Sequence, residues 1–319
     1  MSPIMSCCRY LPSFTRNPIS VFCYHGLRSP NYVGCRADQI HSSSKRSNHS
    51  QSKILSKGLP KKKPITGVKQ IVLVASGKGG VGKSTISVNL AVALKKLQPE
   101  KEVGLLDADV FGPSIPLMMN LHDTPLLTND DLMKPLVNYG VKCISMGNII
   151  TENSAAIWRG LMVMSALDKL IRQVDWNPVD YMVIDTPPGT GDTHLSLAQN
   201  LPISGALVVS TGQKASLQIA RRGITMLNKL QIPVFGIVHN MSSVICTKCS
   251  HKTPLFGDYF EEFSKENDIE ILENVPLDGS VSDGCDSGVP VVISHPESFQ
   301  AKSFVNLAST ILKKLQTSS

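Results

Sequence analysis

Apolar runs with the composition of buried strands alternate along the chain with helical patterns. Continuous runs rich in β-branched residues are typical of strands that are buried on both faces of a parallel sheet. The strand-like runs lie at 71–75, 102–107, 141–146, 180–185, 205–210, 233–238 and 270–272. Apolar stripes at helical spacing lie at 84–97, 161–174, 214–230, 259–265 and 304–315. This alternation predicts a three-layer α/β domain with a mainly parallel central sheet.

A glycine-rich segment lies between the first strand-like run and the first helical stripe. It fits G-x-x-x-x-G-K-[ST], and its place between a strand and a helix is that of a phosphate-binding loop. Backbone N–H groups would bind phosphate oxygens, Lys83 would add a positive charge between the β and γ phosphates, and Ser84 would bind Mg²⁺. The expected nucleotide-binding residues of this segment are Gly77, Lys78, Gly79, Gly80, Val81, Gly82, Lys83, Ser84 and Thr85.

Acidic residues end two of the strand-like runs. Asp107 closes the run at 102–107 and Asp109 lies two residues later, and Asp185 closes the run at 180–185. Carboxyl ends of parallel strands border the crevice where open α/β sheets bind ligands. Asp185 is therefore expected to hold Mg²⁺ opposite Ser84, with Asp107 as support. Capping of a helix that begins near residue 114 is the alternative for Asp107 and Asp109.

Cys246 and Cys249 form a C-x-x-C pair after the run at 233–238, and Lys248 and Lys252 are expected to lower the thiol pKa values. A [4Fe-4S] cluster or a tetrahedral zinc ion takes four ligands, and the sequence has no second C-x-x-C. Two chains that each supply two thiols across a twofold axis would complete a cluster site. A zinc site that includes His251 and a redox dithiol remain alternatives.

Two further cysteines after residue 45 have no other cysteine close to them in the sequence. Cys143 lies in an apolar run and is expected to be a small buried hydrophobe, and Cys285 is expected to be a bystander in a polar loop. The other cysteines are Cys7, Cys8, Cys23 and Cys35.

Positive charge is concentrated near the N-terminus. Residues 1–70 hold twelve Lys or Arg and one acidic residue, whereas residues 71–319 hold twenty bases and twenty-four acids. A Ser- and Arg-rich, acid-poor opening is typical of a mitochondrial transit peptide, although a retained basic tail would have the same composition. We expect a transit peptide at 1–45, a basic connector at 46–68, an ATPase domain at 69–319 and a location in the mitochondrial matrix.

The distribution of charge and of apolar residues also indicates whether nucleic acid or membrane is an expected partner. The mildly acidic region after residue 70 does not favour nucleic acid. No run approaches the roughly 18 apolar residues that span a bilayer, so no stable membrane insertion is expected.

Several strings together carry a family resemblance. They are K-G-G-x-x-G-K-S from Lys78, D-x-D-x-x-G-P-S from Asp107, D-x-P-P-G-T-G-D from Asp185, N-M-S from Asn240 and the C-x-x-C pair. With them the chain resembles the Mrp-type iron-sulfur carriers, a branch of the deviant P-loop ATPases that also include nitrogenase iron protein and MinD. The resemblance implies a SIMIBI, MinD-like fold and a homodimer that binds ATP.

The resemblance also implies roles for single residues. Lys78 would reach across the dimer to the partner's nucleotide, Asp109 would orient the attacking water, and Asn240 would read the adenine edge. His239, where the family has Glu or Gln, is assigned no role. Lys214 and Ile219 stand where the family has acids, and this departure predicts weaker nucleotide control of Lys78.

The activity implied by the resemblance is that of a slow ATPase that serves as a carrier. It would bind a [4Fe-4S] cluster between two copies, accept it from an iron-sulfur donor and deliver it to recipient apoproteins. The mitochondrial branch of the family implies subunits of respiratory complex I as recipients. Two other functions remain open: a MinD- or ParA-like positioning ATPase on membrane or nucleic acid, and a zinc-stabilised nucleotide-binding module.

Overall fold

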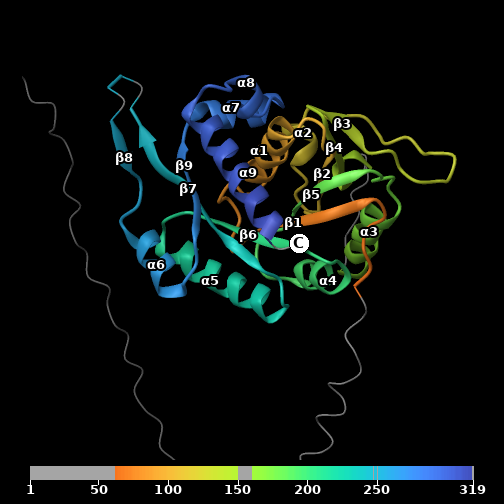
Figure 1. The fold of residues 1–319 in the computed structure, drawn as a ribbon, viewed down its shortest axis with the longest axis horizontal. Coiled ribbons are helices and arrows are strands. Elements are labelled where there is room, and N and C mark those ends of the chain that lie inside the picture. Colours follow the sequence, from red (N-terminus) through yellow and green to blue (C-terminus); the bar gives the residue numbers. More distant parts are fainter. Residues whose placement is uncertain (1–61, 150–159, 247, 250, 318–319) are drawn as a thin grey trace, which may run out of the picture. The chain divides into compact units, whose positions relative to one another are not determined.

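A computed structural model describes residues 62–149, 160–246, 248–249 and 251–317, and a central sheet organises them (Figure 1). The strand order is β3-β4-β2-β5-β1-β6-β7-β8, and β9 also pairs with β7. The pairings are parallel except β3 with β4 and β7 with β8. The strands are β1 Val68–Ser76, β2 Val103–Asp107, β3 Leu136–Asn138, β4 Val141–Ser145, β5 Val179–Asp185, β6 Gly205–Ser210, β7 Val234–Ile245, β8 Lys252–Pro254 and β9 Ile271–Leu277.

Helices cover both faces of this sheet. Figure 1 shows α1, α2, α7, α8 and α9 on one side and α3, α4, α5 and α6 on the other. The helices are α1 Lys83–Leu97, α2 Ile115–Met118, α3 Gly160–Arg172, α4 Asp192–Asn200, α5 Lys214–Lys229, α6 Tyr259–Asn267, α7 Gly279–Ser287, α8 Val291–Ser294 and α9 Phe299–Thr317, with a 3₁₀ turn at Met146–Asn148. The predicted three-layer α/β architecture with a mainly parallel sheet is confirmed.

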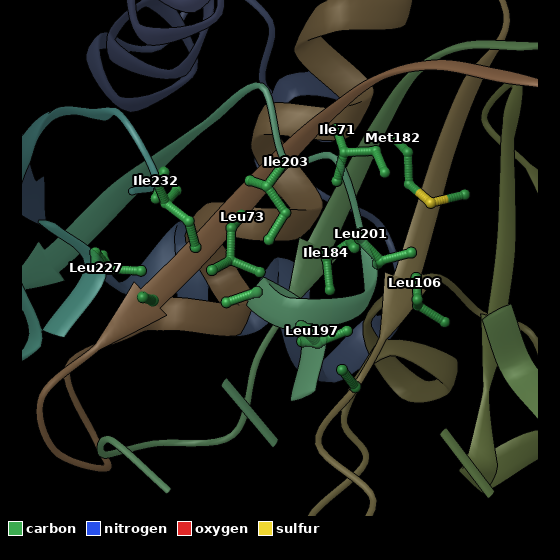
Figure 2. Packing of buried hydrophobic residues seen from close by; sticks show 14 of the residues in the cluster. Ile71, Leu73, Leu106, Met182, Ile184, Leu197, Leu201, Ile203, Leu227 and Ile232 are labelled. Atoms are coloured by element: carbon green, nitrogen blue, oxygen red, sulfur yellow. The ribbon is translucent and has the colours of Figure 1, made fainter. Parts of the chain in front are cut away.

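Strand β1 shows why the core strands are apolar at every position. Ile71 and Leu73 pack into the cluster on the α3–α6 side, whereas Val72 and Val74 pack into the cluster beneath α1 and α9. Figure 2 shows Ile71 and Leu73 near residues of β5 and α4. Because successive side chains point to opposite faces and both faces are covered, each position from Ile71 to Ala75 is hydrophobic.

The place of β1 in the sheet determines where the site forms. It lies between β5 and β6, with Val74 in register with Asp185 and Ser76 in register with Val209. All three strands are parallel, so their carboxyl ends meet at one edge. The glycine-rich loop that follows β1 therefore emerges beside the carboxylate that ends β5.

The structure departs from the sequence expectations in its shorter elements. Residues 279–287 form helix α7, so Cys285 does not lie in a loop as expected; Asp278 caps this helix by accepting a hydrogen bond from the Ser280 backbone N–H. Helix α4 was not expected either, because its polar sequence carries only a weak apolar stripe. Within the surface excursion expected at 121–140, residues 136–138 form β3.

Helix α9 closes the side of the sheet that α1 covers. Its stripe of Phe304, Leu307, Ala308, Ile311 and Leu315 is buried in the cluster that also contains Leu90 and Leu94 of α1. The expectation that the final amphipathic helix packs onto the domain is confirmed. Among the described residues, no helix combines the length and the apolar character that crossing a membrane requires.

We expect Phe304→Ala to lower the free energy of unfolding by about 3–5 kcal/mol, because a fully buried ring leaves a cavity in a packed core. Phe299→Ala, at a ring that is 57% exposed on the same helix, is the control and is expected to change stability by at most about 0.5 kcal/mol. Urea unfolding of the two variants measures both. Equal losses would contradict the packing of α9 described above.

Candidate functional site

The glycine-rich loop forms an open cradle at the carboxyl end of β1. Gly80 and Gly82 have φ angles of 75° and 82°, a region that side chains with a Cβ rarely adopt. A Cβ added at Gly79 or Gly80 would meet no atom within 4 Å, so these backbone groups face free space. The loop lines a cavity of about 220 Å³ together with Asp109, Ser114, Met118 and Pro188. The cradle fits the phosphate groups of a nucleotide.

Asp185 is the centre of the polar contacts below this cradle. It is fully buried, and its carboxylate lies 2.7 Å from the Lys83 Nζ atom. Ser84 and Ser87 each donate a hydroxyl hydrogen bond of 2.6 Å to it. The sequence prediction that Lys83, Ser84 and Asp185 converge agrees with this geometry. A hydroxyl and a carboxylate side by side are hard oxygen ligands of the kind Mg²⁺ prefers.

Asp107 lies on the neighbouring strand β2, in register with Asp185. Burial, and secondarily the charge of Asp185, raise the pKa of Asp107 to about 7. Its carboxylate accepts hydrogen bonds from the Ser145 hydroxyl at 2.9 Å and from the backbone N–H groups of Asp109 and Ile115. Asp107 thus anchors the segment that leads into α2, which is the capping alternative considered for it.

Asp109, two residues after Asp107, borders the phosphate cradle. It lines the same cavity as the glycine-rich loop and accepts a hydrogen bond of 3.3 Å from the Gly112 N–H. Asp109 and Lys78 therefore border the same cavity. The role of Asp109 in orienting water remains a prediction.

Lys78 is held by its own chain in this structure. Its Nζ atom donates a hydrogen bond of 2.8 Å to the Gln213 side-chain oxygen, directly before α5. The loop also approaches α5 closely, because a Cβ at Gly77 would lie 2.8 Å from the Ala220 nitrogen and 2.9 Å from a methyl group of Ile219. The loop is thus bordered by a neutral amide and by Ile219, one of the two residues that stand where the family has acids.

The segment 186–191 is tied to β1 and leads into α4. The Thr186 hydroxyl donates to the Val74 carbonyl at 2.8 Å, and the Gly189 N–H donates to the Ser76 carbonyl at 2.9 Å. The third residue of α4, His194, is 1% exposed, and neither ring nitrogen has a hydrogen-bond partner among the described residues. Burial, and secondarily the positive charge of Lys83, lower the pKa of His194 to about 4. Sequence reasoning missed His194, because no motif marks a histidine that tertiary packing buries.

Asn240 lies in β7 and contacts the loop from the other side. Its amide donates a hydrogen bond of 2.8 Å to the Val81 carbonyl, and the adenine contact inferred for it remains a prediction. The preceding residue, His239, stacks on Phe260 with 3.8 Å between ring centroids and bonds to Asn274. His239 was assigned no role, and its contacts are those of a packed structural residue.

The two thiols of the C-x-x-C pair lie at the end of a β-hairpin rather than in a free loop. Strand β7 runs to Ile245, β8 returns beside it, and the Cys246 N–H donates to the His251 carbonyl at 2.9 Å. Cys246 and Cys249 are both exposed. The pKa of Cys246 is lowered by the backbone N–H groups of Cys249 and Lys248. The lysine ammonium groups, which we expected to lower it, are not the cause.

The other two described cysteines are buried. Cys143 lies in β4, as expected for a small hydrophobe. Cys285 lies with its sulfur 3.7 Å from the Thr85 hydroxyl of the phosphate loop, so it borders the nucleotide site from α7. Among the residues that the structure describes, no three His, Cys, Asp or Glu side chains are grouped so that they could hold a metal ion.

Comparison with known proteins identifies the family of this site. The family described as "ParA: NUBPL iron-transfer P-loop NTPase" matches residues 67–312. The chain belongs to this family. The "Iron-sulfur cluster transfer protein NUBPL" of Mus musculus is 50% identical over 287 residues, which cover 90% of each chain. The "Iron-sulfur protein required for NADH dehydrogenase, mitochondrial" of Arabidopsis thaliana is 47% identical over 79% of this chain and 80% of its own.

Solved structures agree with this assignment to the NUBPL family. A nucleotide-binding protein from Archaeoglobus fulgidus, solved in complex with ADP, superposes with a TM-score of 0.64 at 32% identity over 75% of this chain and 93% of its own. The cell division ATPase MinD of Pyrococcus furiosus superposes with a TM-score of 0.56 at 22% identity over 76% and 98% of the two chains. The latter likeness shows the fold alone, and the expected MinD-like fold is confirmed.

Acid sensitivity offers a test of the buried histidine of this NUBPL-family site. Native His194 stays neutral at a pH where the unfolded chain binds a proton, so its contribution to the free energy of unfolding should fall as the pH drops from about 6.5 to about 4. Asp107, with its pKa raised to about 7, contributes with the opposite sign over the same range, so the test compares variants and not the wild-type slope alone. The slope from one such group is at most about 1.4 kcal/mol per pH unit. Urea unfolding of wild type and His194→Gln between pH 4 and 7 measures it.

We expect the free energy of unfolding of wild type minus that of His194→Gln to decrease as the pH drops over that range, because only wild type carries the contribution of His194. His122→Gln, at an exposed side chain, is the matched control. If the free energy of unfolding of His194→Gln changed with pH as that of wild type does, His194 would not contribute to the acid sensitivity.

Proposed function

We propose that this chain is an ATP-dependent iron-sulfur carrier that binds a [4Fe-4S] cluster between two copies and delivers it to mitochondrial apoproteins. The observation that carries the proposal is the pair of exposed thiols, Cys246 and Cys249, at the end of the β7–β8 hairpin. Membership of a family of iron-transfer NTPases supports a cluster as the cargo.

The two thiols are half of a cluster site. A [4Fe-4S] cluster takes four cysteine thiolates. Cys143 and Cys285, the other cysteines of the described region, are buried elsewhere in the fold. Two hairpins facing each other across a twofold axis would supply the four sulfurs. The thiols are exposed, and the pKa of Cys246 is lowered, which favours the thiolate form that binds metal.

A surface beside the phosphate cradle suits the second copy. A hollow of about 540 Å³ shares Asp109 and Pro188 with the cradle and is lined mainly by apolar side chains. Phe111 at this hollow is 68% exposed. A partner placed over the cradle would cover this ring. The same approach would free Lys78 from Gln213 and let it act on the partner's nucleotide.

Nucleotide binding would exchange the partners of Asp185. In the structure Lys83 neutralises this carboxylate, and phosphate oxygens would attract Lys83 toward the cradle. Asp185 and Ser84 would then hold Mg²⁺, which supplies the positive charge that the triphosphate needs. Asp109 would orient water for a slow hydrolysis. The exchange would alter the dimer contact and loosen the bridging cluster for transfer.

The recipients and the location are proposed from relatives. The Arabidopsis relative is named as mitochondrial and as required for NADH dehydrogenase. We therefore propose the mitochondrial matrix as the location and subunits of respiratory complex I as recipients. The segments of the expected transit peptide and most of the connector lie outside the described residues.

Two other functions make different predictions. A positioning ATPase would bind lipid or DNA with an affinity that falls steeply with salt, and it would be indifferent to Cys246→Ala. A zinc-stabilised module would hold one zinc per chain. Neither has an observation that favours it over the carrier, because the likeness to MinD concerns the fold alone.

Anaerobic reconstitution tests the cluster site. We expect about four iron and four sulfide per wild-type dimer, with absorbance near about 400 nm, because four thiolates hold the cluster. Cys246→Ala and Cys249→Ala should each abolish most of this loading. Cys143→Ala, at a buried thiol, is the matched control. Full loading of a strictly monomeric protein, or one zinc per chain in its place, would refute the proposal.

ATP-dependent association tests the role of Lys78. We expect Lys78→Ala to weaken dimerisation in Mg-ATP by roughly 10- to 100-fold, because a charged hydrogen bond to the partner's nucleotide contributes about 1.5–3 kcal/mol. Analytical ultracentrifugation measures the dissociation constant. Lys83→Ala is the contrasting variant, since it should lose nucleotide binding itself. An unchanged dissociation constant in Lys78→Ala would mean that this lysine does not act across the dimer.

A further inference from the structure

The first turn of α6 contacts two segments that hold the phosphate loop. The Lys214 Nζ atom lies 4.0 Å from the centre of the Tyr259 ring, and His239 stacks on the next residue, Phe260. Lys214 directly follows Gln213, which holds Lys78. His239 directly precedes Asn240, which donates to Val81 of the loop. Each of the two residues that contact the loop is thus adjacent in sequence to a residue that contacts α6.

The same turn of α6 lies at the base of the thiol hairpin. Strand β8 ends at Pro254 and α6 begins at Tyr259, so four residues separate them. The Leu255 N–H donates to the Ser242 carbonyl at 3.2 Å, which ties the returning leg to β7. Figure 1 shows α6 beside the beginning of α5, where the chain returns from β8. One leg of the hairpin therefore leads to His239 and the other leads to Tyr259.

The backbone before α5 packs closely against β7 and the base of the thiol hairpin. A Cβ added at Gly212 would lie 2.8 Å from the Phe256 Cβ and 3.0 Å from the His239 Nε2 atom. The backbone before α5 therefore touches both the hairpin base and β7. Because packed contacts shift between discrete arrangements instead of stretching, movement of Gln213 must be passed on to the residues around it.

We propose that Lys214 and Tyr259 are positioning residues that transmit the release of Lys78 from Gln213 to the thiol hairpin. When Lys78 leaves for the partner's nucleotide, the start of α5 loses its tie to the phosphate loop, and Lys214 carries that change to the first turn of α6. The hairpin base then moves with α6, and the hold of Cys246 and Cys249 on the cluster changes. This inference rests on the proposed function, which supplies the cluster and the action of Lys78 across the dimer.

The interaction energy of the contact between Lys214 and Tyr259 is sufficient for such a role. An exposed cation–π contact supports a shift of about two- to five-fold in an equilibrium. A ligand can shift an equilibrium only as far as its differential interaction with the two states allows. The position of Lys214, where the family has an acid, also gives this chain a cation at the point where the contact is made.

The experiment measures iron release from the reconstituted full chain to a ferrous-iron chelator, in Mg-ATP and in Mg-ADP. The readout is the ratio of the two rates. We expect Tyr259→Leu and Lys214→Gln each to lower this ratio about two- to five-fold, with iron loading unchanged. Tyr259→Phe keeps an aromatic face and Lys214→Arg keeps a cation, so both should retain the wild-type ratio. Arg222→Gln removes a matched exposed charge two turns along α5 and should also retain it.

The outcomes separate this inference from the proposed function. Wild-type ratios in Tyr259→Leu and Lys214→Gln would overturn the inference and leave the carrier function standing. Loss in Tyr259→Phe equal to that in Tyr259→Leu would also overturn it, because the aromatic face would then not be what acts. A wild-type protein that binds no iron would refute the proposed function, and one whose release ignores the nucleotide would refute nucleotide control and this inference together.

Discussion

The buried carboxylate of Asp185 is the constraint on which the rest of the site depends. A charge without access to water must be paired and hydrogen-bonded, and Lys83, Ser84 and Ser87 provide those partners from a single helix and its preceding loop. This requirement fixes the phosphate loop against β5. It also means that Lys83 is already in place, and neutralised, before any nucleotide arrives.

Two further features follow from the sheet edge that Asp185 occupies. Asp107 on β2 lies beside it, and the repulsion between the carboxylates adds to burial in raising the pKa of Asp107. On the other side, β6 and β7 bring Gln213 and Asn240 to the loop. The loop is thus held by Asp185 of β5, by an amide before α5 and by an amide on β7.

The thiol hairpin belongs to the same strand that carries Asn240. Five residues separate Asn240 from Cys246, and the returning chain enters α6 against α5. A cluster bound at an exposed half-site would be held through a partner copy, and the strength of that hold would depend on how the hairpin is presented. The family of iron-transfer NTPases joins a nucleotide site to a metal cargo, and this architecture offers a direct backbone connection between them.

The sequence by itself determined the features that depend on neighbours in the chain. A strand, four glycines and a helix at fixed spacing specify the cradle of Lys83, a strand that closes on Asp185 specifies the acid, and Cys246 with Cys249 specifies the thiol pair. Only the tertiary structure decided what Lys78 touches, that His194 is buried beside Lys83, that Cys285 borders the loop and that Lys214 lies over Tyr259. These contacts join residues that are distant in the chain, and their geometry arises only when the sheet order and the helix packing are complete.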